Sequence, residues 1–174
     1  MIQIYDNFLT NSVYLNFLKI FEESFVPTYE PIGNTYINRF EAYPCHEKII
    51  EDQNLIKDFV EQYQFKTNIP IEKCKILARK TYIDEINQSP FKNKTQGFIH
   101  KDSDSADFAG VLYLENSKSG TSFHDTENHL NPNIFVQAKE NRLVTYLANV
   151  AHAANIDLQK KVRMNIAFFI QVKK

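Results

Sequence analysis

The sequence predicts a mostly β fold with helices at its N-terminal end. Helical periodicity is confined to roughly the first 70 residues, and the remainder carries short β-like runs separated by turn-rich stretches. The spacing of those runs is typical of a sandwich or barrel of antiparallel strands. A length of 174 residues suits one domain, and 43% hydrophobic with 24% charged residues is the composition of a folded globular chain.

The N-terminal region is expected to hold a strand and two helices, which we interpret as support for the β region. Residues 2–5 are expected to form a short strand. Thr10 is a candidate helix cap, and the apolar residues that follow it as far as Phe21 recur with a helical period. A second helical period covers 47–63. A further strand is expected within 34–43, where aromatic residues lie between two prolines.

The region after Pro70 predicts a β core. Its apolar runs define six strands, at 75–83, 98–101, 108–114, 134–137, 142–148 and 162–172. In the last of these, alternation places Arg163 and Asn165 on the same face of an otherwise apolar strand. No linker rich in Gly, Pro or Ser divides the chain. We therefore expect a single domain, with a helical support region at 1–70 and a β core at 71–174.

Charge and hydropathy disfavour several function classes. Lys and Arg number 20 against 21 Asp and Glu, so there is no overall positive field to hold nucleic acid. The apolar runs are shorter than a membrane span, and the first residues lack a cationic leader with an apolar core, so a cytoplasmic location is expected. Cys45 and Cys74 lack the spacing of a zinc site or of a disulfide framework.

A candidate metal site is formed by His100, Asp102 and His152. Residues two apart on an extended segment point to the same side, so His100 and Asp102 could occupy adjacent positions on one metal ion. His152 follows a predicted strand and lies among small side chains that leave room for a ligand. Two His and one carboxylate on one face of a metal is the arrangement of non-haem Fe(II) oxygenases. The alternative is a solvated surface His–Asp pair.

Arg163 is a candidate anion-binding residue. The chain has four arginines, and one within an apolar strand costs free energy unless it meets an anion. A guanidinium fork matches a carboxylate, so the partner is either a bound carboxylate or a structural Asp or Glu. The other histidines are not candidate metal ligands. His124 and His129 fit a solvated loop near a substrate entrance, and His46 fits a surface or capping position.

The order of these features resembles a known enzyme family. The segments that carry the likeness are His100-x-Asp102, Gly110-Val-Leu-Tyr-Leu-Glu-Asn116, Ser119-Gly-Thr-Ser-Phe123, Asn141-Arg-Leu-Val-Thr-Tyr146, His152 and Arg163. Together, over roughly 76–171, they resemble the Fe(II)/2-oxoglutarate-dependent dioxygenases of the prolyl-hydroxylase-like branch. The resemblance implies a distorted double-stranded β-helix, a jelly-roll or cupin-like fold, supported by helices. Two departures, Ser119 and Asn141 at positions where glycine is common, leave the candidate ligands untouched.

The resemblance also implies the roles of individual residues. The iron ligands would be His100, Asp102 and His152, and the residues binding the cosubstrate 2-oxoglutarate would be Arg163, Tyr113, Tyr82 and Asn165. Arg163 would pair with the distal carboxylate, and the Asn165 amide could donate to a carboxylate. Besides these residues, Tyr146, Phe98 and Phe123 are candidate walls of the site.

By the same resemblance, the expected reaction is hydroxylation of a C–H bond with release of succinate and CO2, using O2. The acceptor would be a peptidyl residue, with proline one candidate, or a small molecule, and neither nucleic acid nor a membrane is an expected partner. Two alternatives stay open: a cupin-like metal enzyme that does not use 2-oxoglutarate, and a non-catalytic β-sandwich binding module. The polar loop at 84–97 could be a mobile lid or an ordinary surface loop.

Overall fold

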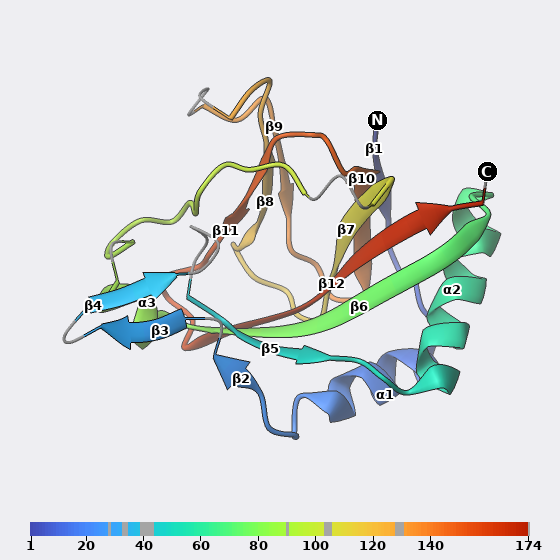
Figure 1. Ribbon diagram of the computed structural model, residues 1–174, viewed down its shortest axis with the longest axis horizontal. Helices are drawn as coiled ribbons and strands as arrows, with labels where there is room; N and C mark the ends of the chain where they lie inside the picture. Colours follow the sequence, from blue (N-terminus) through green and yellow to red (C-terminus); the bar gives the residue numbers. More distant parts are fainter. Residues whose placement is uncertain are drawn as a thin grey trace.

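The computed structural model describes residues 1–27, 29–32, 35–38, 44–89, 91–102, 106–127 and 131–173. A seven-stranded antiparallel sheet has the order β1-β10-β7-β12-β6-β5-β2 (Figure 1). Its strands are β1 (Ile2–Tyr5), β2 (Val26–Pro27), β5 (His46–Ile49), β6 (Ile71–Tyr82), β7 (Phe108–Tyr113), β10 (Arg142–Leu147) and β12 (Val162–Val172).

A second, three-stranded sheet has the order β11-β8-β9, and a separate hairpin joins β3 to β4. These strands are β8 (Gly120–Phe123), β9 (Ile134–Gln137), β11 (His152–Asn155), β3 (Tyr29–Ile32) and β4 (Thr35–Asn38). The helices are α1 (Asn11–Ile20), α2 (Gln53–Thr67) and the short α3 (Ile83–Asn87). Two antiparallel sheets with helical support agree with the predicted jelly roll.

Helices α1 and α2 cover one face of the large sheet, where the main hydrophobic core lies (Figure 1). Phe59 of α2 and Phe168 of β12 are fully buried, and their ring centroids lie 5.2 Å apart. Tyr63 of α2 packs on the same ring and bonds Thr145 of β10 through its hydroxyl, at 2.8 Å. The helical stripes predicted from the sequence are therefore the surfaces that anchor the support region to the sheet.

The opposite face of the large sheet is turned toward the small sheet. Because paired residues of antiparallel strands project to the same side, the register places Arg79, Asn165 and Tyr113 together on that face. The Tyr113 hydroxyl lies 2.6 Å from Oγ1 of Thr121 on β8 and so connects the two sheets. The space between the sheets is where the polar inward side chains gather.

Several predicted elements are confirmed with their bounds, namely β1, β9 and β12. Helix α1 begins directly after Thr10 as expected, but the Thr10 side chain makes no capping hydrogen bond. The prediction for 47–63 is partly wrong. Residues His46–Ile49 form β5, and the helix begins at Gln53 because the Asp52 side chain accepts hydrogen bonds from the backbone N–H groups of Asn54 and Leu55, at 2.9 and 3.2 Å.

Other differences concern the edges of the β core. The stretch 98–101 does not form a regular strand and contributes one bridge, between His100 and His152. Strands β8 and β11 were not predicted, and the expected support region also supplies β1, β2 and β5 to the large sheet. The loop at 84–97 begins within α3. Of the strand expected within 34–43, Thr35–Asn38 is β4, and 39–43 lies outside the described residues.

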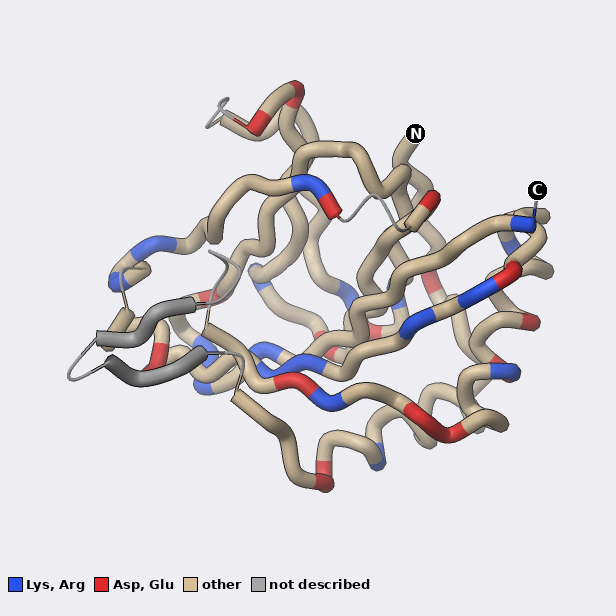
Figure 2. Tube along the Cα trace, in the orientation of Figure 1, with Lys and Arg blue, Asp and Glu red and all other residues tan. Residues whose placement is uncertain are grey.

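Charges of both signs are distributed along the whole trace (Figure 2), which agrees with the net charge of −1. No helix in the described part of the chain is long and apolar enough to cross a membrane.

Candidate active site

Three predicted ligands come together between the two sheets. His100 and His152 are joined by reciprocal backbone hydrogen bonds, each N–H donating to the other's carbonyl at 2.9 Å. The Asp102 backbone N–H donates to the Ala148 carbonyl, also at 2.9 Å, so the segment of the HxD motif is tied to the end of β10. One ligand atom from each of the three side chains lies within 4.8 Å of the other two.

The orientation of both imidazoles suits metal coordination. The Nδ1 atom of His100 lies 3.1 Å from the Phe98 carbonyl oxygen, and that of His152 lies 2.9 Å from the Val150 carbonyl oxygen. Because a carbonyl only accepts hydrogen bonds, each Nδ1 carries a proton, and Nε2 is the ring nitrogen that faces the Asp102 carboxylate. The Nε2 atoms lie 4.0 Å and 3.5 Å from the Asp102 carboxylate oxygens. Such backbone support is typical of metal-ligating histidines.

The electrostatics of the triad also fit a divalent cation. Burial, reinforced by the neighbouring His100, lowers the pKa of His152 to about 3, so its imidazole is neutral at physiological pH. Burial raises the pKa of Asp102, and its Oδ2 is a buried atom with no hydrogen-bond partner among the described residues. A buried carboxylate oxygen without a hydrogen bond costs free energy, and a metal ion would supply a partner for it. The residues present therefore fit a metal ion.

Aromatic side chains enclose the triad. The Tyr146 ring centroid lies 4.6 Å from that of His152 and 5.0 Å from that of Phe123, and both aromatic residues are buried. Burial and the adjacent Asp102 charge hold the pKa of Tyr146 well above its usual value. Tyr146 thus lines the cavity, as predicted, and Phe123 packs against it. Phe98 is 46% exposed and does not enclose the site.

Arg163 lies in the same cavity and supplies a buried positive charge. Its Nη1 donates to Oδ1 of Asn165 at 2.7 Å, and both side chains line the cavity. Its Nε is buried with no hydrogen-bond partner among the described residues, and burial lowers the pKa of the group. No ion pair joins Arg163 to a carboxylate of the described residues. The structural salt bridge considered as an alternative is thus absent from that part of the chain, and the site suits a bound anion.

Comparison with known proteins identifies the fold. No protein-family model matches the sequence, and no curated protein matches it. Among solved structures, a Pseudomonas putida prolyl-4-hydroxylase is similar with a TM-score of 0.60 and 13% identity, over 99% of this chain and 93% of that chain. A Trichoplax adhaerens prolyl hydroxylase, solved with a peptide fragment of hypoxia inducible factor, has a TM-score of 0.60 and 12% identity, over 97% of this chain and 82% of that chain. The alpha-ketoglutarate-dependent epimerase SnoN from nogalamycin biosynthesis has a TM-score of 0.62 and 9% identity, over 98% of this chain and 78% of that chain.

The fold is that of the 2-oxoglutarate-dependent oxygenases. At these identities the likeness establishes the architecture, and the suspected resemblance is confirmed at that level. Within this oxygenase fold, the triad and Arg163 occupy one cavity between the sheets. The cavity measures about 50 Å³, so a keto acid with two carboxylates enters only if some lining side chains shift.

Tyr82 is not brought into this cavity. It pairs with Val162, whose side chain projects from the opposite face to that of Arg163. Tyr82 is 37% exposed, and its ring packs edge-on against His46, with centroids 5.0 Å apart. The inward positions of β6 that pair with Asn165 and Arg163 are Arg79 and Thr81. Sequence reasoning missed Arg79, although an arginine within a strand was the same signal that singled out Arg163.

The remaining histidines lie outside the triad. His124 was expected in a solvated loop, but it is buried, and its Nε2 lies 3.0 Å from the Ser122 hydroxyl oxygen. His129 lies outside the described residues. His46 pairs with Glu85 at 2.9 Å, which agrees with a position near the surface.

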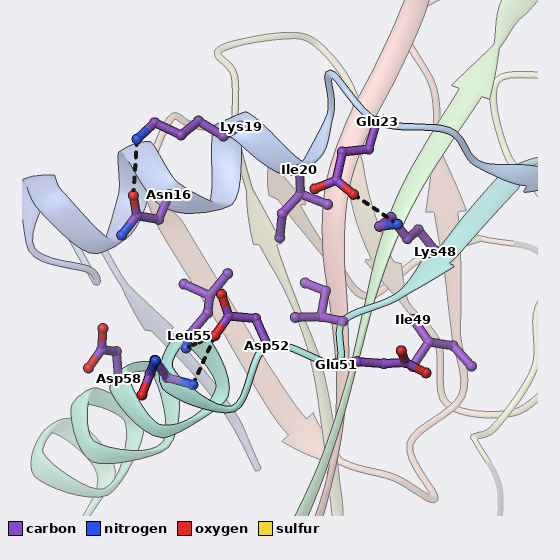
Figure 3. A pocket seen from close by; sticks show the side chains of 12 residues that line it. Asn16, Lys19, Ile20, Glu23, Lys48, Ile49, Glu51, Asp52, Leu55 and Asp58 are labelled. Carbon is purple, nitrogen blue, oxygen red and sulfur yellow. Dashed lines mark hydrogen bonds and ion pairs between the residues drawn. The ribbon is translucent and has the colours of Figure 1, made fainter.

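A larger cavity, about 480 Å³, lies between α1, β5 and the start of α2 (Figure 3). Several of its charged side chains are engaged within the protein: Glu23 pairs with Lys48 at 3.0 Å, and Asp52 caps α2 (Figure 3). Among the described residues, the cluster of His, Cys, Asp and Glu suited to a metal is the triad, which is not part of this cavity. The candidate active site is therefore the cavity between the sheets.

Proposed function

We propose that the protein is an Fe(II)- and 2-oxoglutarate-dependent dioxygenase that hydroxylates a C–H bond of a peptidyl residue or of a small molecule. The observation that carries the proposal is the triad of His100, Asp102 and His152, which shares a cavity with the buried guanidinium of Arg163. Two His and one carboxylate leave coordination positions open, as in non-haem Fe(II) oxygenases. The oxygenase fold agrees with this chemistry.

Each residue of the site has a role in the proposed reaction. With ferrous iron and 2-oxoglutarate bound, the site would use O2 to convert the keto acid to succinate and CO2 and to hydroxylate the acceptor. The triad would hold the metal, and Arg163 would hold the distal carboxylate of the keto acid with help from Asn165. Tyr146 would exclude water from the metal side.

The acceptor is proposed to be a peptide or a small molecule. One structure of the same fold was solved with a peptide fragment, and another is an epimerase, so the fold serves more than one kind of reaction. Proline is one candidate residue. We propose that the chain acts as a single catalytic domain, since β1 and β5 of the support region are hydrogen-bonded within the sheet that carries Arg163.

The first test is an anaerobic titration of Fe(II) and 2-oxoglutarate into the metal-stripped protein, followed by visible absorption. A weak charge-transfer band, characteristic of a keto acid chelated to ferrous iron, is the expected result. Iron binding without the band would favour a cupin-like enzyme that does not use the keto acid. Absence of iron binding would favour a non-catalytic binding module and overturn the proposal.

Two variants assign the roles. His100→Ala should lose iron binding and any turnover of 2-oxoglutarate, because one of three metal ligands is removed. Arg163→Ala should keep iron but require much more 2-oxoglutarate to form the band. A band of normal intensity and affinity in Arg163→Ala would show that the anion site lies elsewhere.

A further inference from the structure

The cavity contains a second guanidinium, that of Arg79 on β6. In the register of the large sheet, Arg79 lies directly opposite Asn165, and Arg163 lies opposite Thr81, two residues further along β6. The two arginines are therefore diagonal neighbours on the same face. Two like charges at one site repel each other, so their placement together requires anions nearby.

Glu47 holds Arg79 in position through one side of its guanidinium. Nε of Arg79 donates to Oε1 of Glu47 at 2.6 Å, and the two residues are directly paired across β5 and β6. Both side chains are partly exposed, at 34% and 22%. No hydrogen bond from Nη1 or Nη2 to the described residues accompanies this ion pair. The outer edge of the guanidinium is thus available to a ligand.

The register of the large sheet places Arg79 nearer to the triad than Arg163. The ring of Tyr146 packs on His152, with centroids 4.6 Å apart. Tyr146 pairs with Ala109, and Ala109 pairs with Phe169 of β12, so the triad lies toward the Phe169 end of that strand. Asn165, opposite Arg79, is four residues from Phe169, whereas Arg163 is six residues from it. Arg79 is therefore the arginine on the metal side of the cavity.

The lining of the cavity carries a net positive charge. Arg79 and Arg163 supply two positive charges and Asp102 supplies one negative charge. Glu47 pairs with Arg79 from outside this lining. Two guanidinium groups and one carboxylate in the lining suit an anionic ligand.

We propose that Arg79 binds the carboxylate of 2-oxoglutarate next to its keto group, while Arg163 binds the distal carboxylate. This inference rests on the proposed function, because it assigns a second anchor for the same cosubstrate.

The test compares two keto acids that share the first carboxylate. Binding of 2-oxoglutarate and of 2-oxobutanoate, which lacks the distal carboxylate, is measured by calorimetry on the Mn(II)-loaded protein. Arg79→Gln should weaken both by a similar factor, about tenfold or more, as expected for loss of a charge-assisted hydrogen bond. Arg163→Gln should weaken 2-oxoglutarate alone. Unchanged binding in Arg79→Gln, or an effect restricted to 2-oxoglutarate, would overturn the inference.

Controls separate folding from binding. Arg142→Gln removes an arginine whose partners, Asp6 and the Gln137 carbonyl, lie outside the cavity, and it should bind both keto acids normally. Arg79→Lys keeps the charge without the fork and should recover part of the affinity for both acids. Should Arg79→Gln prove unstable, a normal affinity in Arg79→Lys for both acids would count against the inference. Wild-type protein that binds Mn(II) but neither keto acid would instead refute the proposed function.

Discussion

Acidification should destabilise the metal-free protein through His152. The imidazole is buried, and its pKa is about 3 in the folded state against an ordinary value of 6.5. Between these values the unfolded chain binds more protons, so stability falls as the pH is lowered through this window. This difference in proton binding lowers the free energy of unfolding by about 1.4 kcal/mol at pH 5.5, and by about 5 kcal/mol below pH 3.

Urea unfolding of the metal-free protein at pH 7.5 and pH 5.5 measures this loss. Other groups titrate in the same range, and Asp102, whose pKa is raised, has the opposite effect. The decisive quantity is therefore the difference between the wild type and His152→Gln, which lacks the titrating imidazole. The wild type should lose about 1.4 kcal/mol more than the variant. Equal losses in the two proteins would refute the argument, whatever the variant's stability at pH 7.5.

Three further predictions concern the metal and the core. Asp102→Ala should abolish the rise in melting temperature on adding Mn(II), because it removes one of the three candidate metal ligands. A preserved rise would contradict the assigned ligand. Phe59→Ala should lower the free energy of unfolding, measured in urea, by about 3–5 kcal/mol, because the ring is fully buried against Phe168. A decrease below about 1 kcal/mol would contradict that packing. Gly110→Ala should strongly lower the melting temperature, because a Cβ there would overlap the Val144 carbonyl oxygen, and wild-type melting would show that the strands can separate.

The sequence was most informative where a local pattern is the direct cause of the structure. Alternation over eleven residues identified β12 with its bounds, since period two is a property of a single strand. The i, i+2 spacing of His100 and Asp102 likewise predicted that the two side chains would lie together, although the expected strand at 98–101 reduces to a bridge. His152 completed the triad as predicted.

The sequence was least informative where the partner segment decides the structure. Strand β11 consists of His152, two alanines and Asn155, which have little intrinsic preference for a strand, and it forms because β8 pairs with it. The start of α2 was predicted too early because an isoleucine pair at 49–50 fits a strand as well as a helix. Pairing of β5 with β6 makes Ile49 part of a strand.

The sequence by itself determined the class of fold, the order of the candidate metal ligands and the residue types that suit iron and a carboxylate, because these depend on periodicity and side-chain chemistry. Tertiary structure alone decided which face of each strand meets the cavity. Tyr82 and Arg79 lie on the same strand, and only its register with β12 turns Arg79 inward and Tyr82 outward. A shift of one residue in that register would exchange the two faces, and no pattern within β6 itself specifies which partner residue lies opposite.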